Sequence, residues 1–177
     1  EGVKESEVGV DGIAMDGRLT WELTAFNRNT TNLLLERVPA PSTGFTSQVF
    51  NGGKVENKGF EAGLAITPIQ RSDLQWVSRA TYTQYRSEVK DLAGLPPFFP
   101  ASSGFGSLGQ TRIEVGKPIT QIVGFAFDEN RNRAPAISQL GNSAPEFRVG
   151  WSNDISWRAF TVNSVLDWQK GGDVINL

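Results

Sequence analysis

Apolar and polar side chains alternate at every second residue over long stretches of this chain, and no other feature of the sequence restricts its fold as much. Between 19 and 27, leucine, tryptophan and alanine alternate with threonine and glutamate, and the same period recurs over 60–66, 74–86 and 160–168. A 3.6-residue period is hard to find. Because successive side chains of a strand point to opposite faces, a period of two predicts strands with one apolar and one polar face. The sequence therefore predicts an all-β fold.

The predicted strands form three long hairpins with long irregular segments between them. Tight turns join the strands within a hairpin, whereas stretches rich in Pro, Gly and polar residues separate the hairpins. The hairpins span about 5–27, 55–86 and 146–169, with turns at 16–17, 68–73 and 158–159 and long segments at about 28–53 and 87–145. Transmembrane β-barrels show this asymmetry, with short periplasmic turns and long extracellular loops. We therefore predict an antiparallel meander of long hairpins that forms a segment of a large transmembrane β-barrel.

Aromatic and charged residues also follow the pattern of a membrane barrel. Trp21, Trp76, Trp157 and Phe160 lie within a few residues of the short turns, where a girdle at a membrane interface belongs. One parity of the central strands carries no charge, although Asn153 and Ser164 are polar. The opposite parity carries Glu22, Glu61, Arg79, Arg148, Asp154 and Asp167. The alternative is a soluble carbohydrate-binding β-sandwich, in which the apolar residues meet in a dry core.

The turns fix the side on which the longest irregular segment lies. If all three short turns lie on one side, the strands that end near 86 and begin near 146 share their outer end. The segment 87–145 then stays outside or crosses an even number of times. We therefore expect the strand-like stretch 119–127 to belong to an ordered extracellular loop.

Composition excludes most other classes of function. The chain has 177 residues, with 17 Lys and Arg against 19 Asp and Glu, so its net charge of −2 excludes a strongly basic nucleic-acid binder. It has no Cys and no His, which removes disulfides, cysteine nucleophiles, the Ser-His-Asp triad and most zinc and haem sites. An enzyme of this composition would therefore have to use carboxylates, Lys, Tyr or a bound cofactor.

Several motifs resemble one known family, and they occur in order over nearly the whole chain. The most specific is the stretch 51–61, NGGKVENKGFE, which is similar to the N-x-G-x-x-x-N-K-G-x-E stretch of SusC/RagA-type TonB-dependent outer-membrane transporters. Further matches are EVGVD at 7–11, NLLL at 32–35, PSTGF at 41–45, VGKPI at 115–119, LGNSAPEF at 140–147 and GGDV at 171–174. The stretch 128–139 is shorter than the family's usual acidic insert.

The resemblance implies a location, a transport activity and partners, and it implies a protein that is not an enzyme and holds neither a metal nor a cofactor. It implies a barrel in the bacterial outer membrane that imports large nutrients such as oligosaccharides or peptides, driven by the TonB complex and capped by a SusD-like surface lipoprotein. The family's plug domain is absent from this sequence. Because six strands cannot close a wide barrel and an open edge is not tolerated in lipid, we expect this sequence to be part of a longer protein.

Three groups of residues are candidates for a binding or catalytic site. Phe98, Phe99 and Phe105 fall in the second long segment, where aromatic rings can stack on cargo or pack against neighbouring loops. Carboxylates at 7, 11, 22 and 61 fit glycoside hydrolysis less well than they fit a hydrated barrel wall. The G-x-G-x-x-G match at 104–109 lacks the strand and helix of a nucleotide-binding loop, so we interpret it as a flexible loop.

Overall fold

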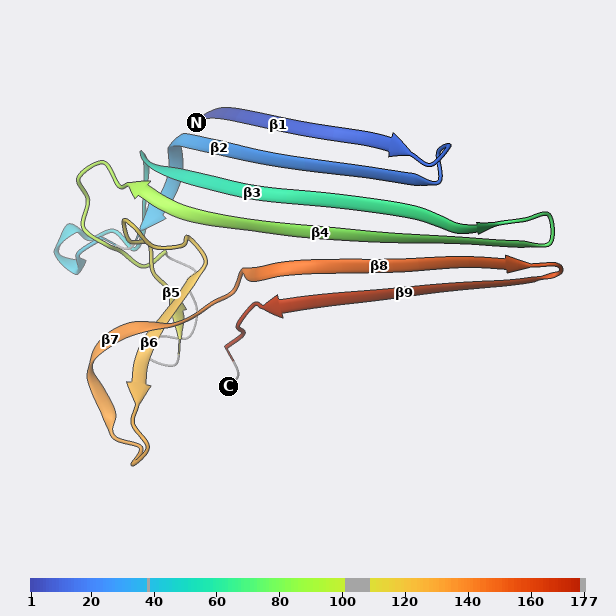
Figure 1. Ribbon diagram of the computed structural model, residues 1–177. Coiled ribbons are helices and arrows are strands. Elements are labelled where there is room, and N and C mark those ends of the chain that lie inside the picture. Colours follow the sequence, from blue (N-terminus) through green and yellow to red (C-terminus); the bar gives the residue numbers. More distant parts are fainter. Residues whose placement is uncertain (38, 101–108, 176–177) are drawn as a thin grey trace.

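A six-stranded antiparallel sheet forms the body of the protein. The computed structural model describes all residues except 38, 101–108 and 176–177. The sheet has the order β1-β2-β3-β4-β8-β9 (Figure 1). Its strands are β1 (Gly2–Ala14), β2 (Leu19–Arg37), β3 (Gln48–Gln70), β4 (Leu74–Asp91), β8 (Pro145–Trp157) and β9 (Phe160–Gly171). This arrangement confirms the predicted antiparallel meander of long hairpins.

Short turns lie at one end of this sheet, which we name the turn end, and long connections leave from the other, the loop end (Figure 1). The β1–β2 turn has three consecutive residues with positive φ, Met15, Asp16 and Gly17, and closes with a hydrogen bond from the Arg18 N–H to the Met15 carbonyl at 3.1 Å. β8 and β9 are joined by two residues, of which Arg158 has a φ of 51°. A positive φ at such turns suits the right-handed twist of the paired strands.

The strands of the first two hairpins continue well beyond their predicted ends on the loop side. β2 reaches Arg37, β3 begins at Gln48, and β4 ends at Asp91. In these extensions polar residues occupy both faces, so the alternation that predicts a strand fades there. The backbone hydrogen bonds of the ladder nevertheless continue, for example between Leu35 and Phe50.

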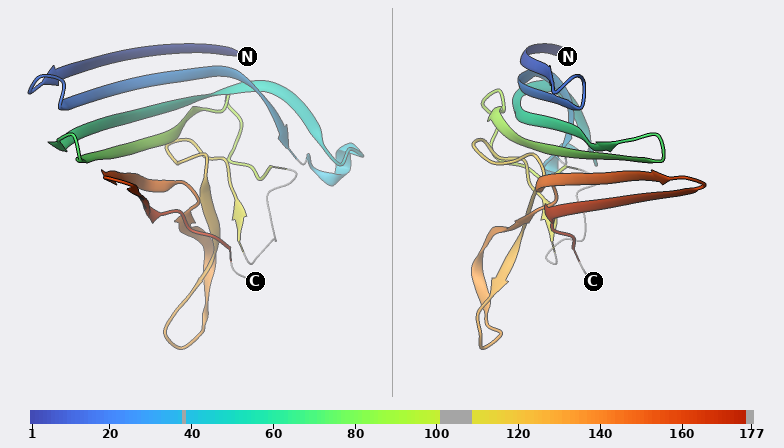
Figure 2. Two further views of the ribbon diagram at one scale, coloured as in Figure 1. Left: turned by 90° about the vertical axis from the view of Figure 1, so that its right-hand side faces the viewer. Right: turned by 45° about the vertical axis from the view of Figure 1, so that its right-hand side comes forward.

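A sharp bend divides the extensions from the rest of the hairpin that β2 and β3 form. Asn32 (φ 55°) and Gly53 (φ 85°) lie opposite each other where the register passes from Thr31↔Lys54 to Leu33↔Gly52. Asn and Gly are the residues that adopt the left-handed region at least cost. Beyond this point the two strands curve toward the concave side of the sheet (Figure 2).

The segment between β4 and β8 forms a separate small sheet. Its order is β5-β6-β7, with β5 at Gln110–Thr111, β6 at Gln121–Phe127 and β7 at Arg133–Asn142. β6 coincides with the strand-like stretch predicted at 119–127, whereas β7, which contains Pro135, was not predicted. The small sheet projects away from the main sheet at the loop end (Figures 1 and 2). Among the described residues, no helix has the length and apolarity needed to cross a membrane.

The main hydrophobic core is small and lies where this segment packs on the main sheet. Val55, Val89, Leu92 and Ile113 are buried together, with Leu33, Leu95, Phe98 and Ile119 packed around them. Val55 and Val89 have the same parity as Glu61 and Arg79 on their strands. The described parts of the segment between β4 and β8 therefore pack on the charged face of the sheet at its loop end and leave the apolar face open.

The sandwich alternative is wrong, because the main sheet is a single layer. No second sheet covers its apolar face in the described part of the chain. Trp151 is 47% exposed and Leu166 59% exposed, whereas a sandwich would bury such residues between its two sheets.

Candidate membrane-facing surface and loop hollow

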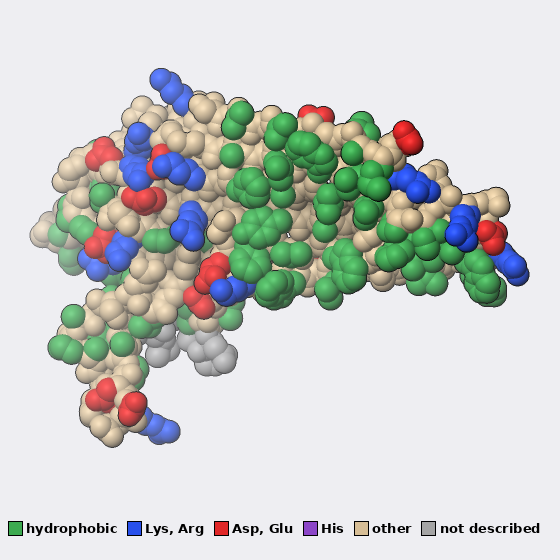
Figure 3. Space-filling model, in the orientation of Figure 1, with side chains coloured by type: hydrophobic (Ala, Val, Ile, Leu, Met, Phe, Trp, Pro, Cys, Tyr) green, Lys and Arg blue, Asp and Glu red, His purple; other side chains and the backbone are tan. Residues whose placement is uncertain are grey.

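The strand register brings the apolar residues of all six strands onto one surface, which we name the apolar face. One row across the sheet runs Gly12, Trp21, Leu64, Ala80, Trp151, Leu166, and the next runs Val10, Leu23, Ala62, Tyr82, Val149, Trp168. Figure 3 shows hydrophobic side chains across this surface, with charged side chains gathered toward its two ends. A continuous exposed apolar surface of this kind marks contact with lipid or with another protein.

Aromatic rings lie at both borders of the apolar face. At the turn end, the rings of Trp157 and Phe160 stack with centroids 6.3 Å apart. Toward the loop end, four rings form a chain of contacts from β3 to β9, with centroid distances of 6.3, 5.7 and 5.2 Å. This chain, which we name the upper aromatic row, consists of Phe60, Tyr82, Phe147 and Trp168.

The separation of these two borders fits the apolar thickness of an outer membrane. Phe147 and Trp157 lie ten residues apart on β8, which is about 33 Å at about 3.3 Å per residue. With a strand tilt of about 40°, the vertical distance is about 25 Å, the height of the apolar band of outer-membrane barrels.

Two hydrogen bonds explain two of the polar residues on the apolar face, Asn153 and Ser78. The Trp76 indole N–H donates to the Asn153 side-chain oxygen at 3.0 Å, and the Trp151 indole N–H donates to the Ser78 hydroxyl at 2.9 Å. Ser78 and Asn153 are register partners on β4 and β8. Each polar side chain thus satisfies an indole donor that hydrocarbon would leave without an acceptor. The sequence gives no sign of these pairs, because their partners are more than seventy residues apart.

The opposite surface, which we name the polar face, holds the charged side chains of the six strands. Arg79 forms an ion pair with Asp154, which also accepts a hydrogen bond from the Asn163 amide at 2.6 Å. Arg148 donates to the Gln169 side chain at 3.0 Å. These contacts join β4, β8 and β9 across their polar surface and resemble the hydrated wall of a pore rather than a closed site.

Glycines on the polar face make room for large neighbours. A Cβ atom on Gly59 would lie 2.2 Å from the Phe26 ring, and one on Gly63 would lie 2.5 Å from the Glu22 carboxylate. Both larger side chains therefore lie flat across the adjacent strand. Glu22 faces Gly63 in register and Glu61 faces Thr24, so these carboxylates do not face each other across the ladder as an acid and base pair would.

Two of the three predicted loop aromatics line one hollow at the loop end. Its volume is about 450 Å³, and Pro39, Ala40, Thr43, Gln48, Pro96, Pro97, Phe98 and Phe99 line it. The Phe98 ring also meets Phe50 edge-on at 5.9 Å, and the Arg112 guanidinium lies 6.0 Å from the centre of the Phe99 ring. Phe105 and most of the stretch 104–109 lie outside the described residues. A binding role for Phe98 and Phe99 stays a prediction.

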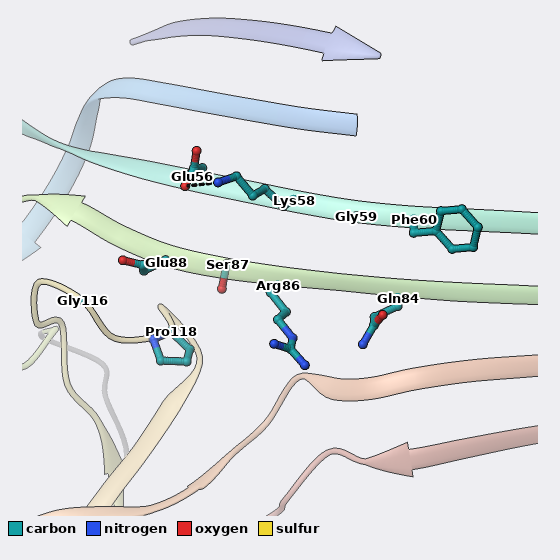
Figure 4. A pocket seen from close by; sticks show the side chains of 10 residues that line it. All are labelled: Glu56, Lys58, Gly59, Phe60, Gln84, Arg86, Ser87, Glu88, Gly116 and Pro118. Atoms are coloured by element: carbon teal, nitrogen blue, oxygen red, sulfur yellow. Dashed lines mark ion pairs between the residues drawn. The ribbon is translucent and has the colours of Figure 1, made fainter. Parts of the chain in front are cut away.

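A second hollow of about 540 Å³ lies beside the part of β4 that follows Thr83, where the pairing of β4 with β8 has ended (Figure 4). Residues of β3 and β4 that continue the parity of the apolar face line most of it, and Gly116 and Pro118 close one side. The backbone N–H of Gly116 donates to the Val89 carbonyl at 2.8 Å, which holds this loop along β4. This hollow could not be predicted from sequence, because it forms between segments that are distant along the chain.

No described part of the chain brings together three residues that could hold a metal ion. At the tip between β6 and β7, Asp128 instead accepts hydrogen bonds from the side chain and the backbone N–H of Asn132, at 2.9 and 2.7 Å. These hydrogen bonds, the side-chain one first, hold the pKa of the Asp128 carboxyl below its usual range. The carboxylate therefore closes a turn.

Comparison with known proteins places this two-faced sheet in a family. The family model described as "TonB dependent receptor-like, beta-barrel" matches residues 1–169. TonB-dependent receptor P26 of Formosa agariphila is 24% identical over 97% of this chain and 20% of its own length, and receptor P39 of the same organism is 29% identical over 99% of this chain and 17% of its own.

Solved structures show the same fold. The RagAB peptide transporter superposes with a TM-score of 0.78 at 19% identity, over 96% of this chain and 21% of the matched chain. The RagAB peptide importer in its "open-open" state gives a TM-score of 0.75 at 20% identity, over 96% and 20%. This chain thus spans about a fifth of the length of the proteins it matches.

These matches confirm the predicted resemblance at the level of the family. The family consists of transporters rather than enzymes, in agreement with the expectation from the resemblance. Its members reside in the outer membrane. The chain belongs to the family of TonB-dependent receptor β-barrels.

Proposed function

We propose that this chain forms part of the wall and of the extracellular loops of a TonB-dependent importer that takes up large nutrients such as oligosaccharides or peptides. The observation that carries this proposal is the two-faced sheet, with apolar side chains on one face and charged side chains on the other. In the proposed importer the apolar face contacts lipid and the polar face lines a hydrated lumen. The described parts of the segment between β4 and β8 that pack on the polar face then lie over the lumen at its extracellular mouth. The chain's part in transport is to form barrel and loops, with energy supplied by the TonB complex.

A SusD-like surface lipoprotein is the expected partner at the loop end. The solved RagAB structures, whose titles name a peptide transporter and importer, support peptides as the first cargo class to test. The hollow lined by Phe98 and Phe99 lies among the loops that cargo would meet, and it combines half-buried rings with proline surfaces.

The test is uptake by cells that carry the complete barrel. Labelled oligopeptides and labelled oligosaccharides are offered separately, with and without an uncoupler that removes the energy for TonB. The proposal predicts energy-dependent uptake of one cargo class, and uptake that does not respond to the uncoupler contradicts it.

Substitution of Phe99 tests whether the aromatic hollow takes part. Phe99→Ala is expected to reduce cargo affinity by about tenfold, since a stacked ring contributes about 1–1.5 kcal/mol. Phe45→Ala is the matched control, because Phe45 is an exposed loop ring that does not line the hollow. Equal effects of the two substitutions would contradict a binding role for Phe99.

A further inference from the structure

The apolar face ends toward the loop end in a row of cations, which we name the loop-end rim. It comprises Lys4, Lys58, Arg86, Lys90 and Lys170. Lys4, Lys58, Arg86 and Lys170 occupy positions that point to the same side of the sheet as the apolar face. Lys90 lies at a register shift and forms ion pairs with Glu56 and Glu88, which also occupy such positions. Toward the membrane the next row is the upper aromatic row, and the Lys170 ammonium lies 6.0 Å from the centre of the Phe147 ring.

The height of the rim matches the lipid headgroups. Lys58 and Arg86 are register partners two residues beyond Phe60 and Gln84. Two residues advance about 6.6 Å along a strand, or about 5 Å along the membrane normal at a tilt of about 40°. The headgroup layer is about 5–7 Å thick on each side of the hydrocarbon, so these two cations lie within it.

Three carboxylates share the rim without neutralising it. Glu56 pairs with Lys58 at 3.1 Å and with Lys90 at 3.2 Å, Lys90 pairs with Glu88 at 2.8 Å, and Glu146 pairs with Lys170 at 3.0 Å. Five cations against three carboxylates leave two positive charges in excess.

Arg86 is the cation best placed for a ligand. It is exposed, and it forms no ion pair with any residue that the structure describes. Its side chain extends from β4 toward the start of β8, along the hollow of about 540 Å³ that Lys58 and Phe60 also line (Figure 4). A guanidinium matches the oxygens of a phosphate with two parallel hydrogen bonds, and it does so more readily than it matches neutral sugar hydroxyls.

We propose that this hollow binds the phosphate-bearing headgroup of a lipid in the extracellular leaflet, with Arg86 and Lys58 on the phosphate and the acyl chains along Phe60 and Tyr82. The inference rests on the proposed function, because it requires the apolar face to lie in the membrane. Glu56 and Glu88 line the same hollow, but Glu56 pairs with Lys58 and Lys90, and Glu88 pairs with Lys90. The Arg86 guanidinium and the apolar surface directly below it therefore complement the two parts of one anionic lipid. A free phosphate ion would use only the first part.

The experiment measures lipid binding to the complete barrel in detergent by native mass spectrometry. The probe is diphosphoryl lipid A, and its dephosphorylated form reports binding by acyl chains alone. Lys58→Gln with Arg86→Gln is expected to weaken binding of the phosphorylated probe by at least about tenfold, because charge-assisted hydrogen bonds are lost. The control pair Arg18→Gln with Arg71→Gln removes equal charge at the turn end and should change affinity less than about twofold.

Two results would overturn the site. One is equal loss in the two double variants, and the other is equally tight binding of the phosphorylated and dephosphorylated probes. Inorganic phosphate at millimolar concentration should not displace the lipid, and displacement would point to an anion site without a lipid. Both variants must keep the heat-resistant migration of a folded barrel. Cargo uptake should be unchanged in both variants. The lipid-binding proposal can therefore be contradicted without contradicting the proposed transport function.

Discussion

At the scale of single residues, the structure explains why polar side chains interrupt a surface that otherwise suits lipid. The side-chain oxygens of Asn153 and Ser78 accept hydrogen bonds from the indole N–H groups of Trp76 and Trp151, respectively. The face of the sheet that carries no charge could be predicted from sequence, because that prediction requires only the alternation of side chains along each strand. The indole pairs could not, because they depend on which residues of β4 and β8 become neighbours, and these two strands are far apart along the chain.

A double-mutant cycle tests the Trp76–Asn153 pair. Asn153→Leu should destabilise the complete barrel when Trp76 is present, because an indole N–H then faces lipid without an acceptor. The same substitution should be neutral or stabilising with Trp76→Phe, which has no such donor. We expect a coupling free energy of about 1 kcal/mol, measured by urea unfolding in lipid vesicles. Additive effects of the two substitutions would contradict the pair.

At the scale of elements, the membrane-crossing parts of the hairpins were more predictable than their ends. Within the membrane, lipid on one side and water on the other impose an alternation that the sequence displays. Beyond the upper aromatic row both faces meet polar surroundings, so the extensions to Arg37 and from Gln48 show no alternation. The hollow lined by Phe98 and Phe99 could not be predicted from sequence either, because residues near 40 and residues near 97 line it together.

The bend in the hairpin of β2 and β3 gives a prediction about local order. Gly53→Ala forces a side chain into the left-handed region, 3.2 Å from the Asp91 carbonyl, at a cost of about 1–2 kcal/mol. Hydrogen exchange of amides 33–36 and 49–52 should therefore quicken by about tenfold. Asn32→Gly keeps the left-handed region accessible and serves as the control. Unchanged exchange in the Gly53 variant would show that the bend does not depend on this conformation.

The tip between β6 and β7 should depend on pH. The lowered pKa of Asp128 means that the closed turn binds a proton more weakly than the open turn does. Stabilisation by the carboxylate is therefore complete above the ordinary Asp pKa and is lost as pH falls through the lowered value. Protection of the Asn132 amide, corrected for intrinsic exchange, should decline at low pH, and Asp128→Ser should remove that dependence. A pH-dependent loss that persists in this variant would assign the effect to another group.

At the scale of the whole molecule, the six strands bury little of their apolar surface. Most large hydrophobic side chains of β8 and β9 stay exposed, including Trp157, Phe160, Val162 and Leu166. A soluble domain rarely exposes an apolar patch of more than a few hundred Å². The isolated chain should therefore aggregate in plain buffer and become monodisperse only in detergent, as followed by size-exclusion chromatography. A monodisperse chain with cooperative melting in buffer would contradict the account.

The most direct test of the two faces is spin-label accessibility on neighbouring residues of the complete barrel in vesicles. This chain contains no cysteine, so single labels can be placed at Ala62→Cys and Glu61→Cys on β3 and at Leu166→Cys and Asp167→Cys on β9. We predict that labels at 62 and 166 collide with oxygen dissolved in lipid, and that labels at 61 and 167 collide with a water-soluble nickel complex. Accessibility that does not alternate between neighbours, or that alternates in the opposite sense, would contradict the assignment of the apolar face to lipid.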